Sequence, residues 1–364
     1  MTPFSHVVAQ CRAGFEPEAL ADLARVAAAA RTGIAGDVRR DAGYVIAETR
    51  PLDSSRWQRA LAAHPPVFAR SVFTGTGAHR LLDAAPAAPP QQARRADRVT
   101  PLLAAIATIV PPFSDVWFEY PDTNDGKALS PLARALAPRI SAALSGRGAL
   151  QPDAPSRLHV FLTDGTTAYV GTSDVSTGAR WPMGIARLHL PRQAPSRSVQ
   201  KLAEALVTFL GERELSLLRA GLRAVDLGAA PGGWTWLLAQ RGLRVTAVDN
   251  GALKGSLAND PLVTHVREDG LTFRPRRPVD WLTCDIVEQP VKIAAVVAGW
   301  IADGAARRAI FNLKLPMKKR YDEVRRCEAV IGERLARSGV GFTLALRQLY
   351  HDREEVTGFI ERIG

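Results

Sequence analysis

The stretch Val225-Asp-Leu-Gly-Ala-Ala-Pro-Gly-Gly-Trp234 decides the fold class of this chain. An apolar run leads into a glycine-rich turn, and a helical pattern begins near Trp234, which predicts a strand, a tight loop and a helix in succession. Glycines let the backbone approach a ligand closely, and the N–H groups of such a turn can meet polar ligand atoms. The glycines lack the G-x-G-x-x-G spacing of dinucleotide-binding loops, which argues against an NAD-dependent dehydrogenase.

The sequence on both sides of this loop alternates between strand and helix patterns. Strands are expected at residues 223–227, 244–248, 263–266, 281–284, 309–313 and 341–346, and an amphipathic helix is expected at 201–219. Such alternation is typical of a doubly wound, mostly parallel α/β sheet. We therefore predict a Rossmann-like domain over residues 187–364.

Acidic residues follow the expected strands beyond the loop. Asp249 stands about 20 residues after Gly228, where an acid can accept hydrogen bonds from ribose hydroxyls; a helix cap or turn is the alternative. Asp269 belongs to an Asp-Gly pair, so a turn is its alternative role. Asp285 and Lys314 each close an apolar strand, where side chains face the ligand crevice of an open sheet. Because a lysine there is costly to bury alone, Asp285 is its expected partner, and the pair can bind a hydroxyl and assist its proton.

The N-terminal half carries α+β patterns and no motif with chemistry of its own. We predict one small domain at residues 1–82, a flexible linker at 83–98 and a second small domain at 99–186. The linker is rich in proline, alanine and arginine, and a solvated tether is favoured over an RNA-binding arm. Both small domains are expected to serve substrate binding.

The composition favours a polyanionic partner. The 364 residues include 47 Lys and Arg against 36 Asp and Glu, a net charge of +11. An arginine- and alanine-rich composition can also reflect a GC-rich genome. The three cysteines lie far apart without Cys or His metal spacing, so we expect no metal and a reduced, cytoplasmic setting. Neither a signal peptide nor a transmembrane segment is expected.

The glycine loop resembles the S-adenosylmethionine loop of the FtsJ-like ribose 2′-O-methyltransferases. These enzymes carry, in chain order, S-R-x-x-x-K-L, an aspartate, a lysine and a glutamate. The resemblance implies four catalytic residues: Lys201, Asp285, Lys314 and Glu355. It also implies S-adenosylmethionine as cofactor, with the acid at Asp269 meeting the adenine amino group. The implied cofactor-binding residues are Ser198, Gly228, Ala230, Pro231, Gly232, Gly233, Asp249, Asp269 and Asp285.

Longer stretches resemble the bacterial 23S ribosomal RNA cytidine 2′-O-ribose methyltransferases of the M type. They are Arg12-Ala-Gly-Phe-Glu16, Asp41-Ala-Gly-Tyr-Val-Ile46, Pro182-Met-Gly-Ile185, Ala194-Pro-Ser-Arg-Ser198, Phe311-Asn-Leu-Lys-Leu-Pro-Met-Lys-Lys-Arg-Tyr321 and Arg347-Gln-Leu-Tyr-His-Asp-Arg-Glu-Glu-Val-Thr357. This resemblance implies a ferredoxin-like domain at 1–82, an RNA-binding THUMP domain at 99–186 and a methyltransferase domain at 187–364. It implies the cytidine at position 2498, in the peptidyl-transferase region of 23S RNA, as substrate.

Two departures and several alternatives accompany the resemblance. Lys314-Leu-Pro-Met-Lys-Lys-Arg320 replaces the usual K-x-F of FtsJ-like enzymes, and Ala230 stands where the M-type loop often has cysteine. Lys318-Lys-Arg320 beside Tyr321 is either a phosphate-binding edge or a solvated helix face.

The alternative functions are 2′-O-methylation of another RNA such as tRNA, base methylation, and a non-catalytic protein that binds S-adenosylmethionine and RNA. A monomer is expected.

Overall fold

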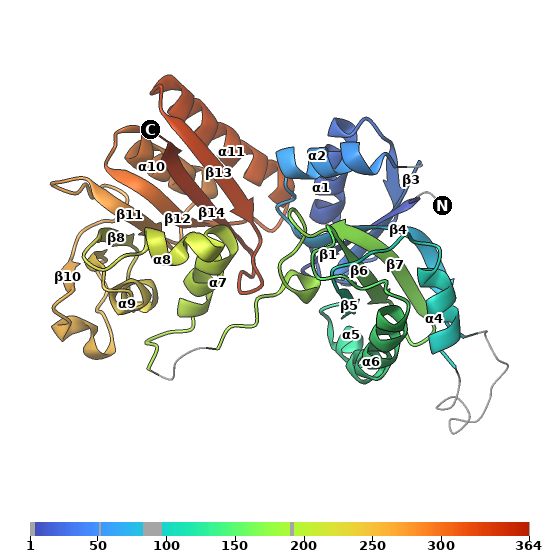
Figure 1. Ribbon diagram of the computed structural model, residues 1–364. Coiled ribbons are helices and arrows are strands. Elements are labelled where there is room, and N and C mark those ends of the chain that lie inside the picture. The colour runs from blue at the N-terminus through green and yellow to red at the C-terminus, as the bar shows by residue number, and fades with distance from the viewer. Residues whose placement is uncertain (1–3, 51, 83–96, 190–192, 364) are drawn as a thin grey trace. The chain divides into compact units, whose positions relative to one another are not determined.

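The computed structural model describes residues 4–50, 52–82, 97–189 and 193–363 (Figure 1). The chain divides into two compact units, Met1–Ile185 and Ala186–Gly364. The linker predicted at 83–98 lies outside the described residues except for Asp97 and Arg98. Asp97 accepts hydrogen bonds from the backbone N–H groups of Val99 and Thr100, which satisfies donors at the start of the next helix.

The first unit is built on one seven-stranded sheet with the strand order β2-β3-β1-β4-β7-β6-β5. Its strands are β1 (His6–Cys11), β2 (Ile34–Gly36), β3 (Tyr44–Thr49), β4 (Ala69–Arg80), β5 (Val116–Glu119), β6 (Ser156–Leu162) and β7 (Thr167–Asp174). Its helices are α1 (Glu16–Ala29), α2 (Ser54–Ala63), α4 (Val99–Ile106), α5 (Asn124–Lys127), α6 (Ser130–Gly146) and the 3₁₀ turn η1 (Pro182–Gly184).

The long strand β4 joins the two N-terminal segments. It pairs antiparallel with β1 on one side and with β7 on the other. The boundary predicted between residues 1–82 and 99–186 therefore runs through a shared sheet. The ferredoxin-like and THUMP assignments stay predictions.

The second unit contains a seven-stranded sheet with the order β10-β9-β8-β11-β12-β14-β13. Its strands are β8 (Arg223–Leu227), β9 (Arg244–Val248), β10 (Val263–Val266), β11 (Val279–Cys284), β12 (Ala306–Lys314), β13 (Gly341–Arg347) and β14 (Glu355–Ile363). Its helical elements are α7 (Val199–Phe209), η2 (Gly211–Arg213), α8 (Glu214–Leu217), α9 (Gly233–Gln240), η3 (Gly255–Asn259), α10 (Pro290–Ala302) and α11 (Arg320–Arg337).

The doubly wound, mostly parallel α/β sheet predicted from the sequence is confirmed. The strands β10, β9, β8, β11 and β12 pair in parallel, whereas β14 runs antiparallel between β12 and β13. Figure 1 shows α7 and α9 on one face of this sheet and α10 and α11 on the other. The apolar side chains of α7, α9 and the sheet form a core that includes Trp234 and Trp281.

The single amphipathic helix predicted at 201–219 is wrong. Helix α7 ends at Phe209, and the short elements η2 and α8 follow it. Gly211 has φ +53°, the left-handed conformation that terminates helices and that glycine adopts without a steric penalty. The apolar periodicity continues past this break, which explains why the pattern alone did not reveal it.

In the described part of the chain, no helix combines the length and the apolar character that a membrane crossing needs. No group of three His, Cys, Asp or Glu side chains among these residues has the arrangement of a metal site. The three cysteines, Cys11, Cys284 and Cys327, are buried thiols.

Candidate active site

The glycine loop connects β8 to α9 and is packed tightly against its neighbours. Gly228 and Gly232 have φ values of +74° and +112°, which disfavour any other residue. A Cβ atom on Gly228 would lie 2.7 Å from Ile286 Cγ1, and one on Gly233 would lie 2.2 Å from Ser198 Oγ. The loop backbone therefore approaches the segments around Ser198 and Ile286 more closely than any side chain at these positions would allow.

Asp249 follows β9 and ties its carboxylate to the glycine loop. Its Oδ2 accepts a hydrogen bond from the Ala230 N–H at 3.0 Å, and its Oδ1 accepts one from the Gly251 N–H at 2.7 Å. Each carboxylate oxygen has two lone-pair directions, so each can accept one further hydrogen bond. Asp249 thus combines a turn role with the capacity to meet ligand hydroxyls, the two functions that the sequence left open.

Asp269 lies in an exposed turn beside the same loop. Its Oδ1 accepts a hydrogen bond from the Leu271 N–H at 2.9 Å, and its carbonyl oxygen accepts one from the Phe273 N–H. A Cβ atom on the adjoining Gly270 would lie 3.6 Å from the Gly228 nitrogen. The Asp-Gly turn therefore packs against the loop. One carboxylate oxygen of Asp269, Oδ1, already accepts a hydrogen bond within the turn.

Ser198 connects the glycine loop to the helix that carries Lys201. Its hydroxyl lies 2.6 Å from the Ser196 hydroxyl, and its carbonyl oxygen accepts a hydrogen bond from Trp234 Nε1 at 3.0 Å. Helix α7 begins at the next residue, Val199. The indole of Trp234, in the first turn of α9, therefore fixes the start of α7 relative to the loop.

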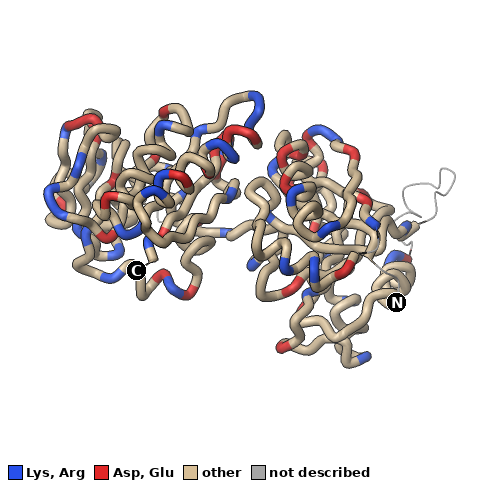
Figure 2. The backbone as a smooth tube through the Cα atoms, turned by 90° about the horizontal axis from the view of Figure 1, so that it is seen from above, with Lys and Arg blue, Asp and Glu red and all other residues tan. Residues whose placement is uncertain are grey.

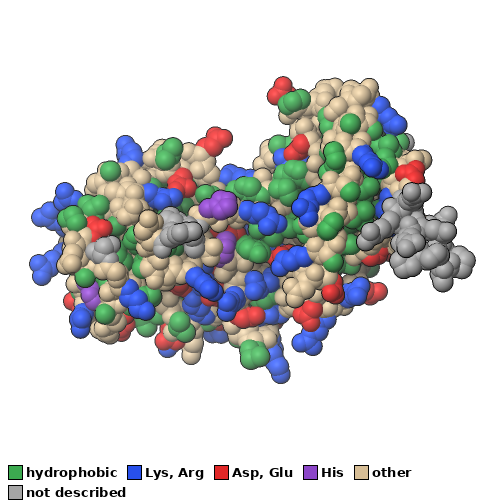
Figure 3. Space-filling view, turned by 90° about the horizontal axis from the view of Figure 1, so that it is seen from below, with side chains coloured by type: hydrophobic (Ala, Val, Ile, Leu, Met, Phe, Trp, Pro, Cys, Tyr) green, Lys and Arg blue, Asp and Glu red, His purple; other side chains and the backbone are tan. Residues whose placement is uncertain are grey.

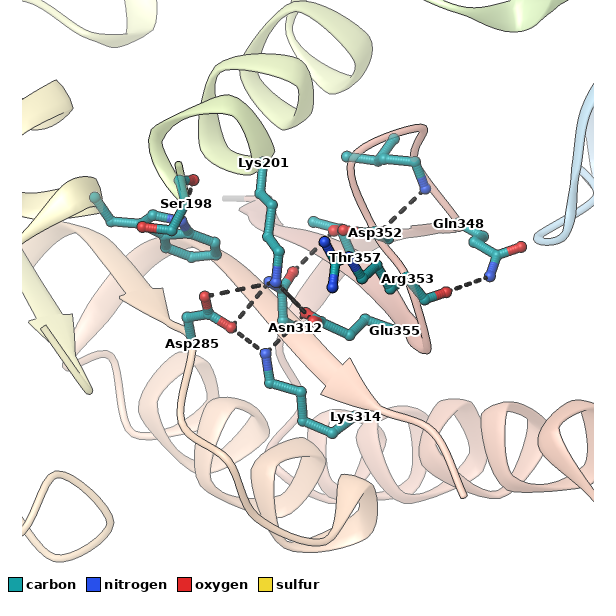
Figure 4. Close-up of polar contacts among 12 residues, drawn as sticks. Ser198, Lys201, Asp285, Asn312, Lys314, Gln348, Asp352, Arg353, Glu355 and Thr357 are labelled. Carbon is teal, nitrogen blue, oxygen red and sulfur yellow. Dashed lines mark hydrogen bonds and ion pairs between the residues drawn. The ribbon is translucent and has the colours of Figure 1, made fainter. Parts of the chain in front are cut away.

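Four charged side chains of the second unit, from α7, β12, β14 and the residue after β11, converge in one cluster (Figure 4). Lys201 Nζ donates to both oxygens of Glu355 at 2.6 and 2.7 Å, and Lys314 Nζ donates to Glu355 Oε2 at 2.8 Å. Lys314 Nζ also donates to Asp285 Oδ1, and Lys201 Nζ lies 4.0 Å from Asp285 Oδ2. These are the four residues predicted as catalytic, and we call them the Lys-Asp-Lys-Glu cluster.

The sheet topology places this cluster next to the glycine loop. In the parallel neighbours β8 and β11, Cys284 is paired with Leu227, so Asp285 and Gly228 leave adjacent strand ends. The Asp285 N–H donates to the Leu227 carbonyl at 3.2 Å. On the other side, Glu355 is the register partner of Lys314 in the antiparallel pair of β12 and β14. The cluster and the loop therefore share the carboxyl edge of the sheet, where ligands bind in open α/β folds.

The cluster is partly buried and its charges are balanced. Its side chains are between 14 and 20% exposed. Burial disfavours the charged form of Lys314, but the carboxylates of Asp285 and Glu355 outweigh it and raise the Lys314 pKa. Burial likewise opposes ionisation of Glu355, but Lys314 and Lys201 outweigh it and lower the Glu355 pKa. Lys314 is therefore an ammonium group in this arrangement.

The basic cluster noted in the sequence divides between exposed and paired side chains. Lys318 and Lys319 are exposed in the connection from β12 to α11. Arg320 Nη1 lies 3.2 Å from Glu354 Oε2, and the Arg325 guanidinium carbon lies 5.5 Å from the centre of the Tyr321 ring. The exposed lysines follow Lys314 closely in the chain, and the phosphate-binding role of this edge stays a prediction.

Three buried polar residues lie behind the cluster and were not among the predicted site residues. Asn312, Asp352 and Thr357 are each 0% exposed, and Asn312 Nδ2 donates to Asp285 Oδ1 at 3.0 Å. They lie in two of the stretches that resemble the M-type enzymes, but the resemblance gave them no role. The available signal was Asn312 itself, a polar residue within the apolar run that forms β12.

Known proteins resemble the chain over its whole length. A family model described as "Ribosomal RNA large subunit methyltransferase M, N-terminal" matches residues 97–174, and one described as "FtsJ-like methyltransferase" matches residues 194–325. The chain is 48% identical to Ribosomal RNA large subunit methyltransferase M of Methylococcus capsulatus, with 100% of both chains covered. It is 45% identical to the protein of that name from Laribacter hongkongensis, covering 97% of this chain and 96% of the relative.

Proposed function

The chain belongs to the ribosomal RNA large subunit methyltransferase M family, and from this premise we propose that it transfers a methyl group from S-adenosylmethionine to a ribose 2′-hydroxyl of 23S ribosomal RNA. The cytidine indicated by the sequence resemblance is the proposed target, and the bacterial cytoplasm is the proposed compartment. The observation that carries the proposal is the direct contact of Lys201, Asp285, Lys314 and Glu355 beside the glycine loop.

The residues around the glycine loop fit S-adenosylmethionine. The positive φ values of Gly228 and Gly232 permit the tight turn of the loop, and Asp249 retains acceptor capacity for ribose hydroxyls. The bound cofactor would supply an electrophilic methyl group on a positively charged sulfur. Within this chain, Asp249 would hold the ribose and Asp269 would meet the adenine.

The Lys-Asp-Lys-Glu cluster supports the attack of a weak nucleophile. A 2′-hydroxyl is poorly nucleophilic at neutral pH, so it must be aligned with the methyl group and its developing negative charge must be stabilised. Lys314, held as an ammonium by Asp285 and Glu355, would donate a hydrogen bond to the 2′-oxygen. Lys201 would keep Glu355 in position. The hydroxyl proton would leave late, as the new O–C bond forms, and would pass to solvent water, because Lys314 is already an ammonium group.

Substitution of Asp249 tests the cofactor site. Asp249→Ala is expected to weaken S-adenosylmethionine binding by roughly 1–3 kcal/mol, because it removes acceptors for ligand hydroxyls and releases the Ala230 N–H. Titration calorimetry measures the change. Asp260→Ala is the matched control, because Asp260 accepts a hydrogen bond in a nearby turn through Oδ1. An Asp249→Ala protein with the affinity of the wild type would contradict the assignment.

The positive charge of the chain suits an RNA partner in both units. Figure 2 shows lysine and arginine distributed along each of the two units, and Figure 3 shows their side chains scattered across the face in view. Phosphate contacts from such side chains position RNA without reading its sequence. We propose that the first unit, Met1–Ile185, provides most of this binding.

Removal of the first unit tests whether this unit provides most of the RNA binding. A chain starting at Ala186 is expected to keep its affinity for S-adenosylmethionine and to lose roughly tenfold or more in kcat/KM for RNA, with a weaker salt dependence because fewer phosphates are contacted. Circular dichroism first establishes that the shortened chain is folded. Equal kcat/KM and equal salt dependence in the two proteins would overturn the proposed role of the first unit.

A further inference from the structure

A line of buried polar side chains runs from the catalytic cluster into the protein interior (Figure 4). Asn312 Nδ2 donates to Asp285 Oδ1 at 3.0 Å. Thr357 Oγ lies 2.8 Å from Asn312 Oδ1 on one side and 2.8 Å from Asp352 Oδ2 on the other. Asn312, Thr357 and Asp352 are fully buried, and these hydrogen bonds join the three side chains to one another and to Asp285.

The chemistry of these groups fixes the direction of the hydrogen bonds. Asp285 is paired with Lys314 as a carboxylate, so it accepts from the Asn312 amide nitrogen. The Asn312 oxygen, which can only accept, then faces Thr357. Because a threonine hydroxyl has a single hydrogen, Thr357 donates that hydrogen to Asn312. The remaining contact, between Thr357 Oγ and Asp352 Oδ2, requires a hydrogen on Asp352.

The surroundings of Asp352 favour such a proton. Burial raises its pKa to about 8, against the hydrogen bonds with the Leu349 N–H and the Thr357 hydroxyl, which lower it. The facing charges are the carboxylates of Glu355 at the start of β14 and Glu204 on α7, and both raise the pKa further. The imidazole of His351, next in the chain, is engaged by Glu204 at 2.6 Å. Arg353, the other neighbour, offers its carbonyl oxygen to Gln348 Nε2 at 3.2 Å.

We propose that Asp352 is protonated at neutral pH and heads a one-way chain of donors, Asp352 to Thr357 to Asn312 to Asp285, that orients the Asp285 carboxylate towards Lys314. Asn312, Thr357 and Asp352 are positioning residues for the methyl transfer. Asp352 also accepts from the Leu349 N–H at 3.0 Å and so anchors the loop that leads into Glu355. The inference rests on the proposed function, because turnover is one of its readouts.

An ionised Asp352 would give a different arrangement. Two acceptors, Asp352 Oδ2 and Asn312 Oδ1, would then compete for the one hydrogen of Thr357. The Asn312 amide would lose its fixed orientation, and the donor to Asp285 would be lost for part of the time. Activity is therefore expected to fall as the pH rises through about 8, the pKa of Asp352.

A pair of substitutions at Thr357 separates positioning from packing. Thr357→Val keeps the shape of the side chain and removes the hydroxyl, and it is expected to lower kcat roughly 10- to 100-fold with unchanged KM for RNA and unchanged S-adenosylmethionine affinity. Thr357→Ser, which keeps the hydroxyl, should retain most of kcat. Thr74→Val removes a buried hydroxyl in the first unit and serves as the control. Equal kcat for Thr357→Val and wild type would overturn the inference.

Infrared difference spectroscopy tests the proton on Asp352 without any assay of activity. The spectrum of the full chain minus that of Asp352→Asn at pH 7 is expected to contain the C=O stretch of a protonated carboxyl, and this band should disappear above about pH 8. A difference spectrum with only ionised carboxylate bands would overturn the inference. If Asp352→Asn does not fold, the Thr357 pair and the pH dependence of wild-type kcat decide. A folded wild type that shows the band but methylates no RNA would refute the proposed function instead.

Discussion

Lys314→Ala is expected to lower the turnover of RNA methylation roughly 10²-fold or more and to leave the affinity for S-adenosylmethionine unchanged. Lys314 Nζ sits between Asp285 and Glu355 at the carboxyl edge of the sheet, and these carboxylates hold it as an ammonium. Its removal takes away the donor that aligns the 2′-oxygen and stabilises its developing charge. Single-turnover kinetics on 23S RNA, with calorimetry of the cofactor, measures both quantities.

Two further variants sharpen this experiment. Lys314→Arg should not restore turnover, because a guanidinium is wider and its fork cannot replace a point ammonium between two carboxylates. Lys292→Ala is the control, since Lys292 is 56% exposed on α10 and pairs only locally with Glu288 at 3.4 Å. Near-wild-type turnover in Lys314→Ala would show that the reacting hydroxyl binds elsewhere.

Glu355→Gln is expected to lower turnover to a similar degree and also to destabilise the second unit. Glu355 accepts hydrogen bonds from both lysines of the cluster, so its loss leaves Lys201 and Lys314 close together with one carboxylate, Asp285, between them. Breaking a partly buried ion pair costs more stability than breaking an exposed one. We therefore expect the free energy of unfolding to fall by about 2 kcal/mol. Denaturant titration measures the loss.

The stability effect should depend on pH in a defined direction. The neighbouring lysines lower the Glu355 pKa against the effect of burial, so its stabilising contribution is present above the pKa of the unfolded chain. That contribution is lost as the pH falls through the lowered pKa of the folded state. The gap in stability between wild type and Glu355→Gln should therefore be full at pH 7 and close in strong acid. Glu354→Gln, at a position 63% exposed, is the control. A gap independent of pH would contradict this account.

The sequence predicted the parallel part of the catalytic sheet closely because its signals are local. The strands β8 and β9 have the bounds expected from their apolar runs, Arg223–Leu227 and Arg244–Val248, each bounded by loop residues. Helix α7 shows the limit of the same reasoning. A left-handed Gly211 ended it, although the apolar periodicity went on.

The sequence predicted which residues form the candidate site, but it did not predict which of them contact one another. Chain order matched Lys201, Asp285, Lys314 and Glu355 to a known family. That Glu355 joins both lysines depends on β14 pairing antiparallel with β12, a long-range contact without a local sequence signal. The resemblance gave Asp352 and Thr357 no role, because the link from Thr357 to the cluster passes through Asn312, which is 45 positions away in the chain.

The position of the transferred methyl group tests the central claim most directly. Unmodified 23S RNA is incubated with the wild-type chain and labelled S-adenosylmethionine, and the product is digested and mapped by mass spectrometry, with Lys314→Ala in parallel. The account predicts a single methylated cytidine with the methyl on its ribose, a neighbouring linkage that resists alkaline hydrolysis, and little product from Lys314→Ala. A methyl group on a base, or equal ribose methylation by both proteins, would contradict it.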